Sequence, residues 1–294
     1  MNYDYYRNLV EEHLLDFLPE VDSKSKTVYD AMVYSVEAGG KRLRPVLLLA
    51  ACDFAGGDVK EALPYALALE YIHTYSLIHD DLPCVDNDDL RRGKPTNHKV
   101  FGEAMATLAG DGLLNSAFEA MLKDTLLDFD NVEMLKRKVK ATNTIAKAAG
   151  CKGMIAGQVA DIEAEGKKCS EEMLGYINAN KTGALITAAV MAGAYIGGAD
   201  KNKLLKLNEY SQCLGLAFQI CDDILDVTGT TEELGKEVGH DAETDKSTYP
   251  AVYGLEYSKA KFKELNEKAI ATLDGLENTE FFVSLVKKLE NRRK

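Results

Sequence analysis

Apolar residues recur at intervals of three and four positions through most of the chain, which is the spacing of one face of an α-helix. This pattern predicts helices near residues 3–18, 24–38, 44–55, 60–82, 100–127, 132–164, 171–197, 202–228 and 258–292. Glycine and proline residues such as Gly39-Gly40 and Pro83 separate them, and no segment alternates as a half-buried strand does. We therefore predict an all-α fold in which residues 1–294 form a single large helical bundle.

Two acidic clusters interrupt this pattern, each at the end of an apolar helical segment. They are Asp80, Asp81 and Asp86, and Asp222, Asp223 and Asp226. Carboxylates at positions where a core is expected are costly unless a positive charge neutralises them. Oxygen ligands of this kind suit Mg²⁺ that carries a phosphate group. The clusters therefore predict a metal site and a diphosphate substrate.

The second cluster lies on a single helical face. Gln219, Asp222, Asp223 and Asp226 follow the spacing i, i+3, i+4 and i+7, while the other faces are apolar. Like charges one turn apart destabilise a helix, so we expect a cation among the three carboxylates.

The first cluster depends on a proline. Pro83 disfavours helical geometry at Leu82, so we expect the helix to bend or end there and Asp86 to return beside Asp80. Arg91 and Arg92 follow closely and supply donors for phosphate oxygens. An EF-hand is a poor alternative because no register places glycine and glutamate correctly. A histidine–aspartate phosphohydrolase is also a poor alternative, because such an enzyme needs further histidines around the pair and this chain has only five in total.

Composition narrows the remaining classes. With 294 residues, 46% of them hydrophobic, the chain can bury a large core. Its net charge of −12 argues against a general nucleic-acid surface. The six cysteines include no CxxC pair, the N-terminus has no signal-peptide pattern, and no apolar run reaches membrane-spanning length. We expect a cytoplasmic protein with no nucleic-acid partner and no integral membrane span.

Taken together, the motifs resemble those of the trans-prenyltransferases, the isoprenyl diphosphate synthases, from about residue 30 to the C-terminal helix. The first acidic cluster is similar to the form in bacterial farnesyl diphosphate synthases and plant-type geranylgeranyl synthases. The segments that carry the resemblance, in the family's order, are Gly-Gly-Lys-Arg-Leu-Arg-Pro, His-Asp-Asp-Leu-Pro-Cys-Val-Asp-Asn-Asp-Asp-Leu-Arg-Arg-Gly-Lys-Pro-Thr, Gly-Met-Ile-Ala-Gly-Gln, Lys-Thr-Gly, Phe-Gln-Ile-Cys-Asp-Asp-Ile-Leu-Asp and Lys-Ser-Thr-Tyr-Pro.

The resemblance implies a bundle of the isoprenoid synthase type with a central active-site cavity, and it assigns roles. Up to three Mg²⁺ ions, with Mn²⁺ as a substitute, would be bound by Asp80, Asp86 and Asp222, with Asp81, Asp223 and Asp226 in support. The allylic diphosphate would meet Arg91, Lys181, Lys236 and Lys246. Isopentenyl diphosphate would be held by Lys41, Arg44, His73 and Arg92. The allylic cation would be stabilised by Thr182, Gln219 and the backbone carbonyl of Lys181.

Such residues suit ionisation chemistry. Loss of diphosphate from an allylic carbon builds negative charge, which Mg²⁺, arginine and lysine stabilise in a water-poor pocket. Isopentenyl diphosphate, held close by, would then attack the cation in a head-to-tail (1′-4) condensation. Proton loss to the released diphosphate would complete the reaction without a nucleophilic triad.

Product length is expected to depend on Tyr75 and Ser76, one turn before Asp80. The bulky Tyr75 would floor a shallow channel, and in the family an aromatic residue there accompanies farnesyl diphosphate. The alternative is that Tyr75 only packs between helices. Geranylgeranyl diphosphate is the second candidate product because residues 97–103 also look plant-type.

Two other classes stay open from sequence. A class I terpene cyclase also has an all-α fold and Mg²⁺ clusters, but it needs no second diphosphate site such as Lys41, Arg44 and Arg92 would form. A noncatalytic regulatory subunit is expected to carry damaged aspartate clusters, and both clusters are intact.

The resemblance to the trans-prenyltransferases also implies that the protein forms a homodimer.

Overall fold

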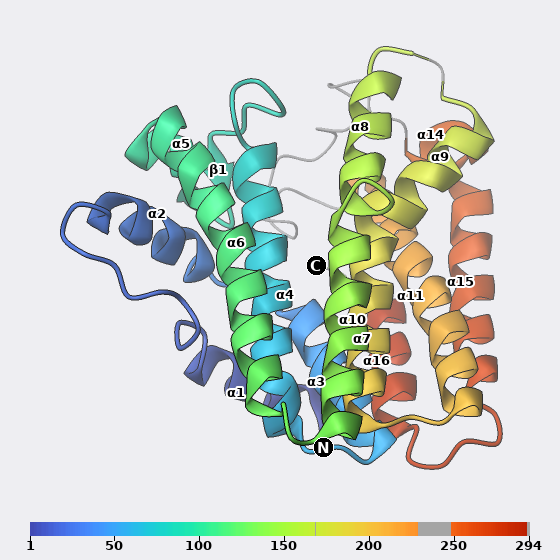
Figure 1. Ribbon diagram of the computed structural model, residues 1–294. Coiled ribbons are helices and arrows are strands. Elements are labelled where there is room, and N and C mark those ends of the chain that lie inside the picture. Colours follow the sequence, from blue (N-terminus) through green and yellow to red (C-terminus); the bar gives the residue numbers. More distant parts are fainter. Residues whose placement is uncertain (168, 229–247, 293–294) are drawn as a thin grey trace.

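The computed structural model describes residues 1–167, 169–228 and 248–292 and is all-α, as predicted (Figure 1). None of the helices in these ranges is long and apolar enough to span a membrane. The helices are α1 (Tyr3–Glu12), α2 (Lys26–Val36), α3 (Leu43–Ala55), α4 (Val59–Asp80), α5 (Asn97–Phe101), α6 (Glu103–Leu127), α7 (Val132–Ala149), α8 (Met154–Ala164), α9 (Glu171–Ile177), η1 (Asn178–Gly183), α10 (Ala184–Gly197), α11 (Lys201–Thr228), α14 (Tyr249–Tyr253), α15 (Leu255–Thr272) and α16 (Glu280–Glu290).

The sequence pattern missed one small sheet. In the described ranges the only strands are β1 (Leu90–Arg91) and β2 (Lys94–Pro95), which pair antiparallel with Leu90 opposite Pro95. Strands of two residues are too short to show an alternating pattern. The turn between them carries Arg92 and Gly93, both with positive φ.

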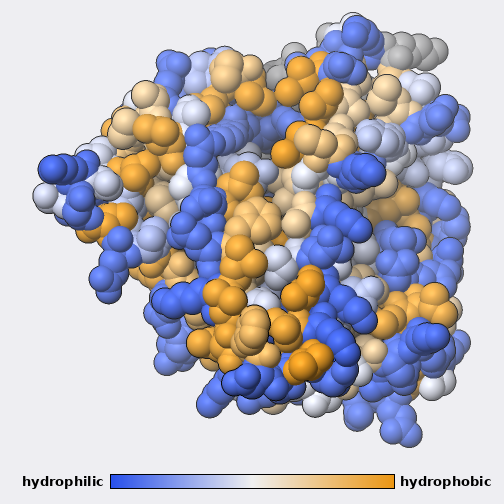
Figure 2. Space-filling view, viewed as in Figure 1, coloured by the Kyte–Doolittle hydropathy of each residue, from blue (hydrophilic) through white to orange (hydrophobic). Residues whose placement is uncertain are grey.

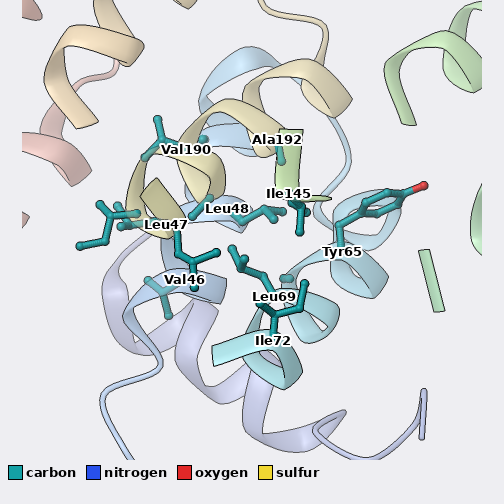
Figure 3. Close-up of a cluster of buried hydrophobic side chains, with 14 of the residues drawn as sticks. Val46, Leu47, Leu48, Tyr65, Leu69, Ile72, Ile145, Val190 and Ala192 are labelled. Atoms are coloured by element: carbon teal, nitrogen blue, oxygen red, sulfur yellow. The ribbon is translucent and has the colours of Figure 1, made fainter. Parts of the chain in front are cut away.

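The core forms where α3, α4 and α10 meet. Side chains of α3 (Val46, Leu47) face Leu69 and Ile72 of α4 and Val190 of α10 (Figure 3). All of these side chains are fully buried. Helices that are apolar on most faces belong in the interior of a bundle, where packing rather than intrinsic propensity stabilises them. Around this centre, α4 also packs on α6, α10 on α7, and α11 on α15.

Several predicted helices are divided. The predicted helix 132–164 breaks around Gly153, and 258–292 breaks where Gly275 has a φ of 77°. The predicted helix 171–197 contains the π-helical segment η1, and 100–127 is interrupted at Gly102 with a φ of 82°. Positive φ at Gly102 and Gly275, which glycine adopts without strain, ends helices that the apolar pattern alone continues.

Close helix contacts explain much of the small-residue content. A Cβ atom on Gly157 of α8 would lie 2.1 Å from the backbone nitrogen of Lys181, and one on Gly215 of α11 would lie 3.1 Å from Cα of Gly183. Glycine is therefore required at position 157 for α8 to approach η1 this closely, and position 215 leaves little room for a larger residue.

A buried lysine links three helices at the end of the bundle where α4 begins. The Nζ atom of Lys138 on α7 lies 2.7 Å from Glu61 on α4, 2.8 Å from Asp124 on α6 and 2.5 Å from Asp128. The Lys138 side chain is 2% exposed. Burying a cation is tolerable when several carboxylates surround it in this way.

Gly193→Ala tests the closest approach in the core. A Cβ atom at Gly193 of α10 would lie 2.0 Å from the carbonyl oxygen of Leu48 on α3. Because backbone cannot yield as a flexible side chain does, we expect the free energy of unfolding to fall by about 1–3 kcal/mol. Urea unfolding followed by circular dichroism measures it. The control is Gly175→Ala on α9, where a Cβ meets nothing within 4 Å and stability should be unchanged or slightly higher. Equal stability of the two variants would contradict the prediction.

Candidate active site

A cavity of about 430 Å³ lies between α4, α6, α8 and η1. Seven of the predicted site residues line it together: Arg44, His73, Tyr75, Ser76, Asp80, Lys181 and Thr182. These residues come from positions far apart in the chain, so the fold brings the separate motifs to one place. Arg44 makes one part of the cavity cationic, and Asp80 makes another part acidic.

The first acidic cluster turns back as Pro83 predicted. Helix α4 ends at Asp80, and the backbone N–H of Asp86 donates a hydrogen bond to the carbonyl oxygen of Asp80 at 2.9 Å. A residue that sequence reasoning left without a role also reaches this point. The Nε2 atom of Gln158 on α8 donates to Oδ1 of Asp80 at 2.6 Å.

Asp81 faces a different environment from Asp80. Its side chain is 4% exposed, and Nε of Arg91 donates to its Oδ1 at 2.9 Å. Arg91 also lies 3.0 Å from Asp88. Burial raises the pKa of Asp81, while the hydrogen bond from Arg91 opposes that shift. The pair therefore fastens the loop after α4 to the end of that helix.

The second acidic cluster is tied to η1 by a glutamine. Thr182 donates from Oγ1 to Oε1 of Gln219 at 2.8 Å, and Nε2 of Gln219 donates to Oδ1 of Asp223 at 2.8 Å. The other oxygen of Asp223 accepts from the backbone N–H of Tyr249 at 2.8 Å. Asp223 and Asp226 are buried, with 4% and 3% exposed. One run of hydrogen bonds thus connects η1, α11 and α14.

Asp222 is the more accessible member, with its side chain 38% exposed. Nη1 of Arg292, which follows α16, lies 2.6 Å from its Oδ1. The Arg292 guanidinium also sits 5.0 Å from the ring centroid of Phe218. Sequence reasoning expected a cation beside Asp222 but missed Arg292, because no motif marks the residue after the last helix.

The carboxylates suit a hard cation in kind, although they are not gathered into a closed cage. In residues 1–167, 169–228 and 248–292, no group of three histidine, cysteine or acidic side chains is arranged to hold a metal. Asp80, Asp86 and Asp222 are partly exposed. Mg²⁺ usually takes only one or two protein carboxylates and completes its shell with water and substrate phosphate. The donor set therefore fits Mg²⁺ that arrives with a diphosphate.

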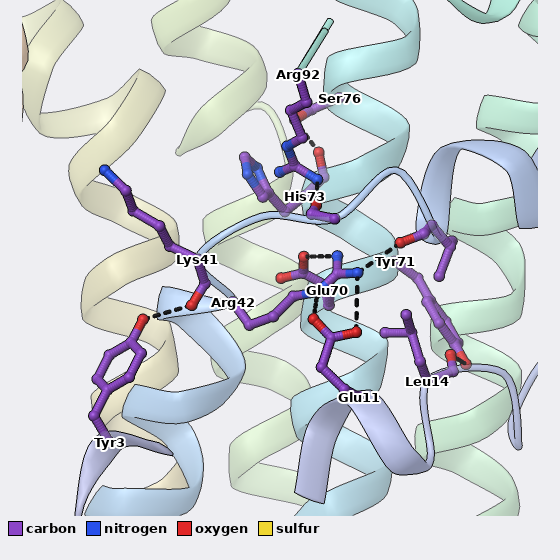
Figure 4. A network of polar contacts seen from close by, with 12 residues as sticks. Tyr3, Glu11, Leu14, Lys41, Arg42, Glu70, Tyr71, His73, Ser76 and Arg92 are labelled. Atoms are coloured by element: carbon purple, nitrogen blue, oxygen red, sulfur yellow. Dashed lines mark hydrogen bonds and ion pairs between the residues drawn. The ribbon is translucent and has the colours of Figure 1, made fainter. Parts of the chain in front are cut away.

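A cluster of positive charge lies beside the cavity (Figure 4). It contains Lys41, Arg42, Arg44 and Arg92, with His73 among them. Burial lowers the pKa of Arg44 to about 10, and its Nε is buried without a hydrogen-bond partner in the part of the chain that the structure describes. Burial, and then the charges of Arg44 and Arg92, lower the pKa of His73 well below its usual value. Crowded, desolvated cations of this kind favour a bound anion.

Lys181 is held by a neighbour that the sequence did not single out. Its Nζ lies 2.6 Å from Oδ2 of Asp161 on α8. Asp161 is three positions after Gln158, so one face of α8 contacts both Lys181 and Asp80. The spacing of three positions between Gln158 and Asp161 was the sequence signal that could have placed both side chains on the face of α8 toward the site. Lys236 and Lys246 lie outside the described residues.

Tyr75 lies against the inner wall of the cavity. It is 6% exposed, and its ring meets that of His79 edge-on with centroids 5.6 Å apart. His79 is fixed in turn by a contact of 3.0 Å between Nε2 and the carbonyl oxygen of Thr107. Ser76 also lines the cavity, and its hydroxyl donates to the carbonyl oxygen of His73 at 2.8 Å.

Known proteins match the chain over most of its length. It is 51% identical over 255 residues to a farnesyl diphosphate synthase of Geobacillus stearothermophilus, covering 87% of this chain and 84% of that protein. It is 50% identical over 254 residues to the heterodimeric geranylgeranyl pyrophosphate synthase large subunit 1, chloroplastic, of Arabidopsis thaliana, covering 85% and 68%. The crystal structure of an FPP/GFPP synthase from Zymomonas mobilis aligns with a TM-score of 0.83 at 32% identity, covering 97% and 96%.

The family model for polyprenyl synthetase matches residues 25–280. That range includes both acidic clusters, the cationic cluster and every helix that lines the cavity. Together with the similar fold of the solved synthase, the match confirms the isoprenyl synthase fold predicted from the motifs. The chain belongs to the polyprenyl synthetase family of prenyltransferases.

Proposed function

We propose that this prenyltransferase condenses isopentenyl diphosphate head-to-tail (1′-4) with dimethylallyl and geranyl diphosphates to give farnesyl diphosphate. Residues 1–294 would act as one domain. The observation that carries the proposal is the cavity itself, which is lined by the cationic Arg44, the hydrogen-bonding His73, the acidic Asp80 and the ring of Tyr75. Two diphosphates and one growing apolar tail require those surroundings.

The carboxylate side of the cavity would receive the allylic diphosphate. Asp80, Asp86 and Asp222 would bind Mg²⁺, and Mg²⁺ or Mn²⁺ would neutralise the charge that develops on the departing diphosphate. Lys181, already oriented by Asp161, would add positive charge there, with Arg91 close to the end of α4. Lys236 and Lys246 are assigned to this substrate only by the resemblance of their motifs.

The cationic cluster would hold isopentenyl diphosphate through Lys41, Arg44, His73 and Arg92. Because the pKa of His73 is well below its usual value, its imidazole is neutral at pH 7 and acts as a hydrogen-bonding group. Fixing the second substrate next to the first converts a collision in water into a reaction between neighbours. Thr182, Gln219 and the carbonyl of Lys181 would face the allylic cation, and the released diphosphate would take the proton.

Product length is the point on which the relatives differ. The bacterial relative is named a farnesyl synthase and the plant relative a geranylgeranyl synthase, at nearly equal identity. The position of Tyr75 on the cavity wall supports farnesyl diphosphate. Geranylgeranyl diphosphate is the alternative if the tail passes beside Tyr75.

The two other classes are less well supported. The cationic cluster would have no use in a terpene cyclase, which binds one diphosphate. A regulatory subunit would not need the contacts that orient Asp80, Lys181 and Gln219. The cytoplasmic location stays a prediction.

The purified protein, incubated with isopentenyl and dimethylallyl diphosphates and Mg²⁺, should form farnesyl diphosphate, identified by chromatography of the dephosphorylated product. Formation must depend on both substrates. Hydrocarbon from a single long diphosphate would instead indicate a cyclase, and no turnover would indicate the regulatory class.

Asp80→Ala and Asp222→Ala should each lower the rate in this assay by about 10²–10³-fold or more, because charge on the leaving group is no longer neutralised. Both variants should remain folded, since each removes a carboxylate from a repelling group. Asp130→Ala, at an exposed position between α6 and α7, is the control and should keep the full rate.

Tyr75→Ala should shift the product from C15 toward C20, because removing the ring deepens the channel for the tail. The same chromatography measures the distribution of products. Tyr257→Ala, at a tyrosine that is 52% exposed on α15, should leave the distribution unchanged. An unaltered profile for Tyr75→Ala would show that this ring only packs between helices.

We also propose a homodimer. Exposed apolar side chains gather on the face made by α6, α7 and α8, where Figure 2 shows apolar patches. Light scattering should give twice the chain mass of 32.3 kDa. Leu126→Glu, at a position 66% exposed on α6, should weaken the dimer, whereas Leu205→Glu, at one 72% exposed on α11, should not. A wild-type monomer at all concentrations would contradict the proposal.

A further inference from the structure

One arginine of the cationic cluster points away from the cavity. Arg42 precedes α3 with φ 52° and ψ 34°, a left-handed conformation that is uncommon for residues other than glycine. Its side chain is fully buried. Its position in sequence, between Lys41 and Arg44, places it inside the segment that carries two of the proposed substrate ligands.

The guanidinium of Arg42 joins three separate parts of the chain (Figure 4). Nη1 donates to Oε1 of Glu70 on α4 at 2.8 Å, and Nε donates to Oε1 of Glu11 on α1 at 2.9 Å. Nη2 donates to the carbonyl oxygen of Val36 at the end of α2 at 2.8 Å. The planar fork of arginine can satisfy three acceptors in fixed directions at once, which a lysine ammonium cannot do with the same geometry.

The segment around Arg42 is held at further points. The carbonyl oxygen of Lys41 accepts a hydrogen bond from the hydroxyl of Tyr3 at 2.5 Å. The guanidinium of Arg92 hydrogen-bonds to the carbonyl oxygen of Gly39, and a Cβ atom on Gly40 would lie 2.7 Å from Cζ of Arg92. The backbone of residues 39–41, just before the left-handed residue, is therefore held at two points.

Glu70 connects this anchor to the site. It is 2% exposed and lies one turn before His73 on α4, so both face the same side of that helix. Its charge opposes the lowering of the pKa of both Arg44 and Arg92 by burial. The same carboxylate thus orients Arg42 and offsets the positive charge of its neighbours.

From these contacts we infer that Arg42 is a positioning residue: it fixes the left-handed turn that aims Lys41 and Arg44 at the diphosphate of isopentenyl diphosphate. The inference rests on the proposed function, because it assumes which substrate the cationic cluster binds. Arg42 itself does not touch the substrate. A displacement of its neighbours by a fraction of an ångström is sufficient to weaken a site built from several directed contacts.

Arg42→Lys tests the inference, since it keeps the charge and removes the fork. Calorimetric titration with isopentenyl diphosphate in the presence of EDTA isolates the cationic cluster, because carboxylates without metal repel a diphosphate. We expect the affinity to fall about tenfold. In steady-state assays with Mg²⁺, the KM for isopentenyl diphosphate should rise similarly, while the KM for the allylic substrate should stay within about twofold.

The matched control is Lys138→Arg, which makes the reverse exchange at another buried cation with several carboxylate partners. Glu61, its partner on α4, is about 13 Å along that helix from Glu70 at ~1.5 Å per residue. We expect a lower melting temperature and an unchanged affinity. Equal loss of affinity in both variants would mean that any loosening of the bundle weakens binding, and would overturn the inference.

If Arg42→Lys does not fold, Glu11→Gln is the second variant that tests the anchor. Glu11 is 42% exposed, and removing its charge leaves the contact between Arg42 and Glu70 in place. It should weaken isopentenyl diphosphate binding in the same direction, by about threefold. Wild-type affinity in every folded variant of this anchor would refute the positioning role. A wild-type protein that binds no isopentenyl diphosphate and forms no product would instead refute the proposed function.

Discussion

The spacing of side chains along α4 is the constraint on which the rest of the site depends. Glu70, His73, Tyr75 and Asp80 all lie within the last three turns of this helix. The helix is buried against α3, α6 and α10, so it cannot rotate or slide without disrupting the core. Glu70 and the proposed site residues after it are therefore held at fixed separations by one rigid element.

Opposed charge is the second organising feature. The acidic clusters lie at the ends of α4 and α11, several cations gather around residues 41–44, and like charges within each group repel one another. The structure offsets this with a few internal partners: Arg91 for Asp81, Arg292 for Asp222, and Glu70 for the arginines. In the proposed function, Mg²⁺ and the diphosphates would supply the remaining opposite charge.

Much of the fold and of the candidate site could be predicted from the sequence, because it depends on interactions between residues close together in the chain. Helical periodicity located most elements, Pro83 predicted that Asp86 returns to Asp80, and the spacing on α11 put Gln219 and its aspartates on one face. What the sequence could not show were contacts between distant segments. Gln158 with Asp80, Arg42 with Glu70, and Arg292 with Asp222 each join elements far apart in the chain. The breaks within predicted helices were also missed, because a glycine permits a helix to end but does not require it to do so.

The side chain of Gln219 has only one available orientation. Its NH₂ group donates to Asp223, and its oxygen accepts from Thr182. A carboxylate accepts but cannot donate, so a rotated amide would set oxygen against oxygen on α11. The dipole of this amide is consequently locked with its negative end toward η1. Asp223 thereby sets the orientation of the amide. In the proposed reaction, Gln219 would not need to reorient when positive charge forms near η1.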